Sequence, residues 1–136
     1  MSAALDTLTG LDKLADVARQ VVRDTPAPEP SVITIYPSRN EVNIQPPHTS
    51  DPVAALGMLL VWTHRLTGIT GTWTHTDDKH LHVSFSGRGP AGVGIRVYGS
   101  IPFDFARGYM TLPAGERESV TPDELYRLAL AIRKGQ

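Results

Sequence analysis

This sequence of 136 residues contains no cysteine. The absence excludes disulfide bonds, thiolate metal ligands and cysteine nucleophiles together. It also favours the cytoplasm over an oxidising compartment, where small domains commonly rely on disulfides. The segment from Met1 to Thr9 has no basic stretch followed by an apolar core. We therefore expect no signal peptide and a cytoplasmic location.

Long apolar runs and an excess of positive charge are missing as well. The longest apolar run, residues 53–62, is interrupted by Gly57 and has about half of the roughly 20 residues that span a bilayer, so we expect no membrane partner. A net charge of −1 argues against a dedicated duplex-DNA protein, which carries basic groups to neutralise phosphates. Lysine is scarce, with three residues against ten arginines. That bias is typical of high-GC genomes, such as those of actinobacteria and their phages.

The overall composition of the chain fits one globular domain. Hydrophobic residues make up 40% of the chain and charged residues 20%, which is not the signature of a disordered protein. We divide the chain into an amphipathic helix over residues 1–25, a proline-rich connector over residues 26–30 and a compact α+β domain over residues 31–136.

The N-terminal helix is predicted from apolar residues at three- and four-residue spacing. These are Leu8, Leu11, Leu14, Ala15, Ala18, Val21 and Val22. The prolines of residues 26–30 end the helix and favour a stiff, extended connector. The helix is therefore predicted to be an appendage whose apolar stripe needs a partner surface, either on its own domain or on another copy. We predict a homodimer, with self-association through Leu8, Leu11, Leu14 and Val21.

The rest of the chain alternates between strand and helix patterns. Strands are predicted over residues 32–36, 41–45, 69–76, 80–86 and 93–98. A helix begins at Pro52 after a cap at Ser50 or Asp51, runs to about Thr67 and stops at Gly68. Because it is apolar almost all round, we expect it to be covered on both sides. Thr121 and Glu124 form a capping box for the last helix. The predicted fold is α+β, a single five-stranded, mainly antiparallel sheet with helices packed on one face, in the order helix-β-β-helix-β-β-β-helix.

No catalytic or cofactor motif in the chain has the context that its chemistry needs. Residues 87–92 match the dinucleotide string G-x-G-x-x-G, but a strand follows them where the pyrophosphate would need a helix N-terminus. His80 and His82 share a strand face without an assured third metal ligand. The paired acids at 77–78 and 123–124 lie in a turn and in a helix first turn, where acids are expected for structural reasons. We therefore predict no catalytic residues, no cofactor and no metal.

One face of the predicted sheet is polar but poor in charge. It carries Thr34, Tyr36, Asn43, Gln45, Thr70, Thr72, Thr74, Thr76, His80, His82, Ser84, Ser86, Arg96 and Tyr98. Charge depletion with tyrosines present is typical of the centre of an interface, although threonine also favours strands for its own reasons. The predicted binding residues on this face are Tyr36, Thr72, Thr74, His80, His82, Ser84, Arg96 and Tyr98.

Three functions stay open at this point. The first is a non-enzymatic protein–protein interaction or regulatory module that self-associates through the N-terminal helix, the charge-poor face or both. The second is a binding module for a small polar ligand or single-stranded nucleic acid, with Tyr36 and Tyr98 stacking on bases and Arg88 and Arg96 meeting phosphate. Sparse basic groups disfavour nucleic acid as the partner. The third is a small enzyme that uses His80, His82 and Arg96.

Overall fold

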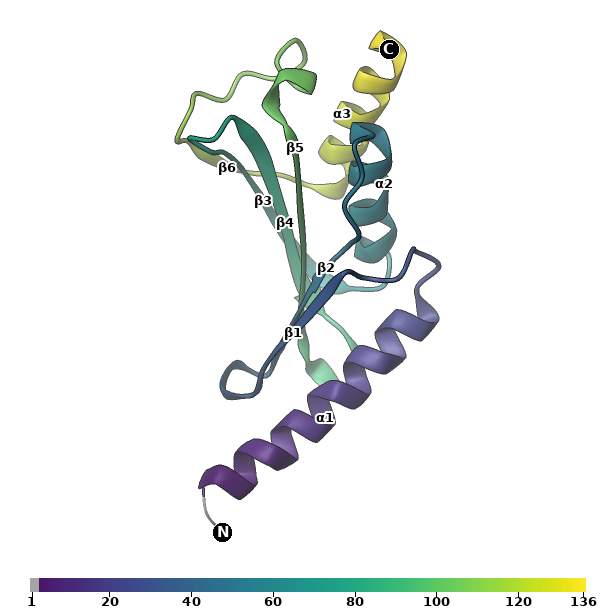
Figure 1. Ribbon diagram of the computed structural model, residues 1–136, viewed down its shortest axis with the longest axis vertical. Helices are drawn as coiled ribbons and strands as arrows, with labels where there is room; N and C mark the ends of the chain where they lie inside the picture. The colour runs from purple at the N-terminus through teal and green to yellow at the C-terminus, as the bar shows by residue number, and fades with distance from the viewer. Residues whose placement is uncertain (1–2) are drawn as a thin grey trace.

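The computed structural model describes residues 3–136, with side chains from residue 7 onward, and has an α+β fold (Figure 1). The described chain holds three α-helices, α1 (Ala3–Asp24), α2 (Pro52–Thr63) and α3 (Pro122–Gly135). Its strands are β1 (Val32–Tyr36), β2 (Glu41–Gln45), β3 (Thr67–His75), β4 (His80–Arg88), β5 (Gly94–Pro102) and β6 (Arg117–Ser119). Short 3-10 turns, η1 (Pro37–Arg39), η2 (Pro90–Gly92) and η3 (Phe103–Phe105), link some of these elements.

Within residues 3–136 the strands form one mixed sheet of six strands in the order β1-β2-β5-β4-β3-β6. The prediction of five mainly antiparallel strands is therefore wrong in detail. β6 was missed because its three residues are polar and exposed, and pairing with β3 is what holds them as a strand. β2 and β5 pair in parallel. That pairing brings together distant segments, which local periodicity does not report.

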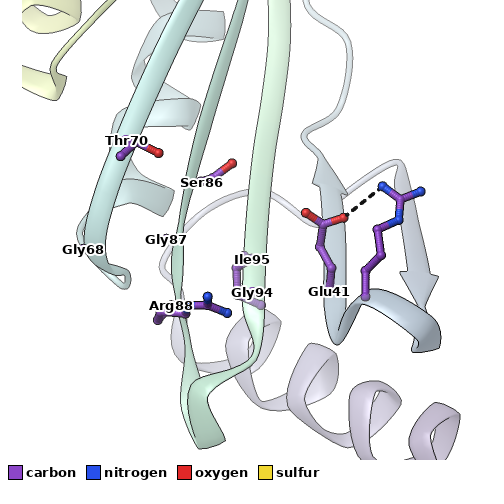
Figure 2. Close-up of a pocket in the computed structure, with 9 residues that line it drawn as sticks. Glu41, Gly68, Thr70, Ser86, Gly87, Arg88, Gly94 and Ile95 are labelled. Carbon is purple, nitrogen blue, oxygen red and sulfur yellow. Dashed lines mark ion pairs between the residues drawn. The ribbon is translucent and has the colours of Figure 1, made fainter.

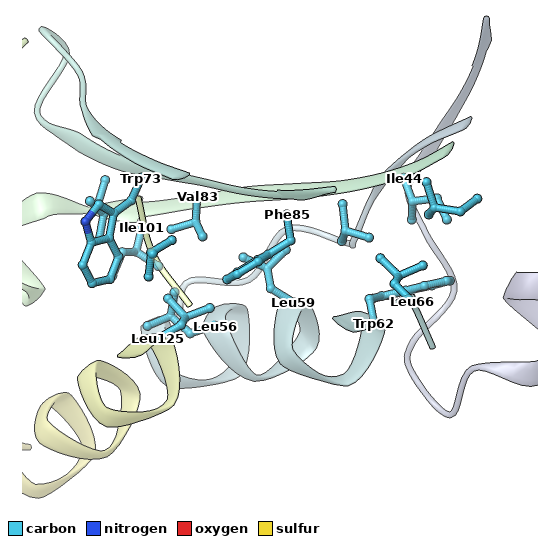
Figure 3. Close-up of a cluster of buried hydrophobic side chains, with 14 of the residues drawn as sticks. Ile44, Leu56, Leu59, Trp62, Leu66, Trp73, Val83, Phe85, Ile101 and Leu125 are labelled. Carbon is cyan, nitrogen blue, oxygen red and sulfur yellow. The ribbon is translucent and has the colours of Figure 1, made fainter. Parts of the chain in front are cut away.

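The hydrophobic core lies between one face of the sheet and the helices (Figure 3). α2 contributes Leu56, Leu59 and Trp62, which point at the sheet, while Leu125 reaches the same core from α3. α3 lies beside α2 in Figure 1, so α2 is covered by the sheet on one side and by α3 on another. This arrangement explains why α2 is apolar almost all round.

α1 packs against η1, η2 and the β1–β2 part of the sheet. Leu14, Val17, Ala18 and Val21 from this helix are all buried in the core. The helix is therefore docked on its own chain in this structure. Of the four predicted self-association residues, Leu14 and Val21 lie in the core, whereas Leu8 and Leu11 are exposed.

The predicted caps are confirmed, and one helix end is corrected. The Asp51 side chain accepts hydrogen bonds from the amides of Val53 and Ala54 at the start of α2, and Thr121 and Glu124 form the capping box of α3. α2 ends at Thr63, earlier than predicted. The turn that follows buries Leu66, and Gly68, with φ of 60°, lies in β3 at an irregularity of the β3–β4 register. Within residues 3–136, no helix has the length and apolarity that crossing a bilayer requires.

Candidate functional site

The sheet face opposite the helices, which we call the open face, is the first candidate surface. In the view of Figure 3 the sheet bends away from the helices at its ends, so the open face is the concave one. The register places polar residues in rows across it. One row is Thr34, Asn43, Arg96, Ser86 and Thr70; the next is Tyr98, Ser84, Thr72 and Ser119; a third is Ser100, His82, Thr74 and Arg117.

Four of the predicted binding residues meet at the centre of the open face. The Arg96 Nε donates a 2.8 Å hydrogen bond to the hydroxyl of Ser84, a residue that is only 8% exposed. The Arg96 guanidinium carbon is 5.6 Å from the centre of the Tyr98 ring, and the His82 ring centre is 5.9 Å from that of Tyr98. The centre is thus a connected group of polar side chains that orders Arg96.

The other predicted residues are more scattered. Thr72 and Thr74 are the β3 neighbours of Ser84 and His82. His80 lies at the start of β4, where its Nδ1 is 3.1 Å from the Asp78 carbonyl oxygen. Tyr36 lies at the end of β1, and the Arg39 guanidinium covers its ring at 4.1 Å. Tyr36 and Tyr98 thus each lie near an arginine of their own chain, Arg39 and Arg96.

Asn43 is an unusual member of the open face. It is 8% exposed, and its side-chain oxygen has no hydrogen-bond partner within the described residues. It lies between Thr34 and Arg96 in the register. A buried acceptor without a donor is costly, so Asn43 lowers the stability of this row.

The middle of the open face has few charged residues, whereas the ends of the face carry several. Glu41, Arg88 and Arg117 also point to this side, by their register with Tyr36, Gly94 and Thr74. Glu41 is not among the residues predicted for this face. Arg88 and Arg117 lie outside the predicted strands, at the end of β4 and in β6.

The remaining motif residues have structural surroundings. The G-x-G-x-x-G string passes through η2 into β5, so no helix follows it, as predicted. His75 is buried, stacks on Phe103 with ring centres 3.6 Å apart, and places its Nδ1 2.6 Å from the Leu112 carbonyl oxygen. Among the described residues, no group of three or more histidine, aspartate or glutamate side chains could hold a metal ion.

A cavity of about 410 Å³ opens at one end of the open face. Figure 2 shows its walls on β2 to β5, including Glu41, Thr70, Ser86, Arg88 and Gly94. Arg39 also lines it and lies 3.6 Å from the Glu41 carboxylate. Sequence reasoning missed this cavity because its walls come together only through the parallel β2–β5 pair.

Comparison with protein-family models, with curated protein sequences and with solved structures found no match to this chain. Its function is therefore argued from its own surfaces.

A second candidate surface lies where α1 meets β1, and we call it the α1–β1 surface. An apolar groove of about 420 Å³ runs between the two elements. Its lining residues are Ala15, Ala18, Arg19, Val22, Arg23, Ile33 and Ile35. Leu8 and Leu11 continue the α1 side of the groove at helical spacing and are 57% and 38% exposed, and Ile33 across from the helix is 41% exposed.

The half-buried His82 provides a test of the open face by pH. Burial, and then the positive charge of Arg96, lower the pKa of His82 below its usual 6.5. As the pH falls below about 6.5, the unfolded chain takes up this proton before the folded one does. The His82 contribution to stability is therefore complete above that pH and is lost toward the lower pKa of the folded state.

As the pH is lowered from about 7.5 to about 5, we expect the free energy of unfolding to fall less in His82→Gln than in the parent. Urea titrations at the two pH values measure this difference. The matched control is His64→Gln at an exposed histidine, which measures the effect of the same substitution away from the open face. An unchanged pH dependence in His82→Gln would show that His82 is solvated in the folded protein.

Proposed function

We propose that this chain is a non-enzymatic interaction module that self-associates as a homodimer through the α1–β1 surface. The observation that carries the proposal is the second apolar stripe of α1. Leu8, Leu11, Ala15 and Val22 follow helical spacing along the groove. Such spacing is what a helix presents to a partner helix, and it lies beside the stripe that α1 already buries in its own core.

The two edge strands of the sheet also differ, and the difference favours β1 over β6 as the edge that pairs with a second copy. β6, at one edge, has three residues and carries Arg117 and Glu118. A short, charged edge strand resists pairing with another sheet. β1, at the other edge, has the sequence VITIY, with no charge and no proline. Its outer edge is therefore suited to backbone pairing with a second copy.

A single two-fold axis can place both β1 and α1 against the same elements of a second copy. An axis normal to the sheet beside β1 pairs the two β1 strands antiparallel and sets the two α1 helices antiparallel on the same face. Asp12 and Asp16 precede Arg19 and Arg23 along α1. Arg19 and Arg23 each pair with an acid of their own helix, Asp16 and Asp24. In the antiparallel arrangement the arginines of one copy would also lie toward the acids of the other, and this charge complementarity is the reason to favour a second copy as the occupant.

The test is the solution mass of the full chain over a range of concentrations, by light scattering or sedimentation. We expect a monomer–dimer equilibrium in the parent. Leu8→Glu and Ile33→Lys should each raise the dimer Kd by about tenfold or more, because a charge placed within an apolar contact removes at least about 1.4 kcal/mol. The Kd comes from the concentration dependence of the mass.

The matched control is Tyr126→Glu, which places the same charge on an exposed aromatic residue of α3. Its dimer Kd should equal that of the parent. Circular dichroism and urea unfolding check that each variant is folded. A parent chain that is monomeric throughout the concentration range, or a dimer that Leu8→Glu and Ile33→Lys leave intact, contradicts the proposal.

A further inference from the structure

We propose that the cavity at the end of the open face binds an oxyanion, the phosphate or carboxylate group of a small ligand. This goes beyond self-association, because the α1–β1 surface shares no lining residue with the cavity. A volume of about 410 Å³ is within the range of small-molecule sites. Three features support this assignment: the hydrogen-bond donors in the cavity, their contacts within the chain, and the lack of a side chain at Gly94.

Arg88 and two hydroxyl groups form the donor side of the cavity. Thr70 and Ser86 are direct partners across β3 and β4, and Figure 2 shows their hydroxyl oxygens on the same side of the sheet. Within residues 7–136 neither hydroxyl has a protein hydrogen-bond partner. Ser86 also lies directly across from Arg96 in the β4–β5 register. Free hydroxyl donors beside a guanidinium are the groups that an oxyanion accepts from.

Both arginines of the cavity have contacts within the chain that favour their positions. The Arg88 Nη1 donates a 3.3 Å hydrogen bond to the Gly92 carbonyl oxygen. The Arg39 side chain is 63% exposed, lies 3.6 Å from the Glu41 carboxylate and covers the Tyr36 ring at 4.1 Å. Such contacts lower the cost of ordering these side chains on binding. Glu41 is the one acid of the lining; it is neutralised by Arg39 and lies across β5 from Arg88 (Figure 2).

Gly94 keeps the cavity open. A Cβ at Gly94 would point into the cavity, 3.6 Å from the Arg88 Nη1 and 3.8 Å from the Glu41 Cγ. These are ordinary contact distances and the backbone at Gly94 is not in the left-handed region, so the fold does not require glycine here. A larger side chain at this position would fill the space between Arg88 and Glu41 while leaving the strand intact.

The test titrates the full chain with inorganic phosphate and, separately, with acetate, at constant ionic strength set by sodium chloride. Amide shifts in ¹H–¹⁵N spectra are followed at residues 70, 86 and 88. We expect saturable shifts with at least one of the two anions. Arg88→Gln should weaken the affinity for that anion by about tenfold, the effect of losing a charge-assisted hydrogen bond. Gly94→Val should also weaken the affinity for that anion, because its side chain would lie between Arg88 and Glu41.

The matched control is Arg117→Gln, which removes the same charge from the open face on β6, outside the cavity. It should change the affinity by less than about twofold, because exposed charges beyond a Debye length are screened. A response to phosphate alone assigns the site to phosphate, and a response to acetate as well assigns it to oxyanions in general. The proposal is overturned if neither anion gives saturable shifts, or if Arg88→Gln and Arg117→Gln weaken binding equally.

Discussion

Phe85→Ala is expected to lower the free energy of unfolding by about 3–5 kcal/mol, the cost of emptying a phenylalanine site in a closed core. Phe85 is 0% exposed and lies between the sheet and Leu59 (Figure 3). Its cross-strand partner is Gly71, where an added Cβ would lie 2.5 Å from the Phe85 ring. The ring therefore occupies the space that a side chain on β3 would take, and no neighbour on that strand can refill it.

Urea unfolding followed by tryptophan fluorescence measures this loss, because Trp62 and Trp73 are both buried in the same core. The control is Phe105→Ala, the same substitution at a phenylalanine that is 39% exposed. Its effect should stay below about 1 kcal/mol. Equal losses in the two variants would mean that the core does not close over Phe85 as the structure shows.

Leu14→Ala is expected to lower the free energy of unfolding by about 2–5 kcal/mol. Leu14 is 1% exposed and belongs to the core cluster, although it lies on the helix that the sequence suggested to be an appendage. The large cost follows from the docking of α1 on β1, β2 and η2. Urea unfolding at protein concentrations where the chain is monomeric measures it without a contribution from association.

The control for this prediction is Leu8→Ala, on the same helix but exposed. It should change the free energy of unfolding of the monomer by no more than about 0.5 kcal/mol. The pair of variants thus separates the stripe that α1 buries in its own core from the stripe proposed to meet a second copy. If Leu14→Ala is as mild as Leu8→Ala, α1 is not part of the folded core.

Local patterns in the sequence were sufficient for several elements. β1 and β2 begin and end where alternation and prolines predict, and Asp51 and Thr121 cap the helices that follow them. These features depend on neighbouring residues alone, so they can be read without knowing the tertiary fold.

Features that depend on distant partners were not predictable in this way. β6 is held through pairs such as Trp73 with Glu118, whose carboxylate accepts a 2.8 Å hydrogen bond from the Trp73 Nε1. The cavity at the end of the open face joins Glu41 to Gly94 through the parallel β2–β5 pair, two strands that the sequence does not identify as neighbours. The residues predicted for self-association lie on two different stripes of α1. Helical spacing alone does not indicate which of the two stripes is buried in the core of its own chain.

The parallel ladder between β2 and β5 has a consequence for the order in which the chain folds. It joins residues 41–44 to residues 94–97, and α2, β3 and β4 lie between them in the chain. Closing so long a loop costs chain entropy before any ladder bond forms, whereas the β3–β4 and β4–β5 pairs need only short loops. The meander of β3, β4 and β5 can therefore form early, and the α1–β1–β2 segment completes the sheet afterwards. The half of the fold that carries the proposed dimer surface is then the half that assembles last.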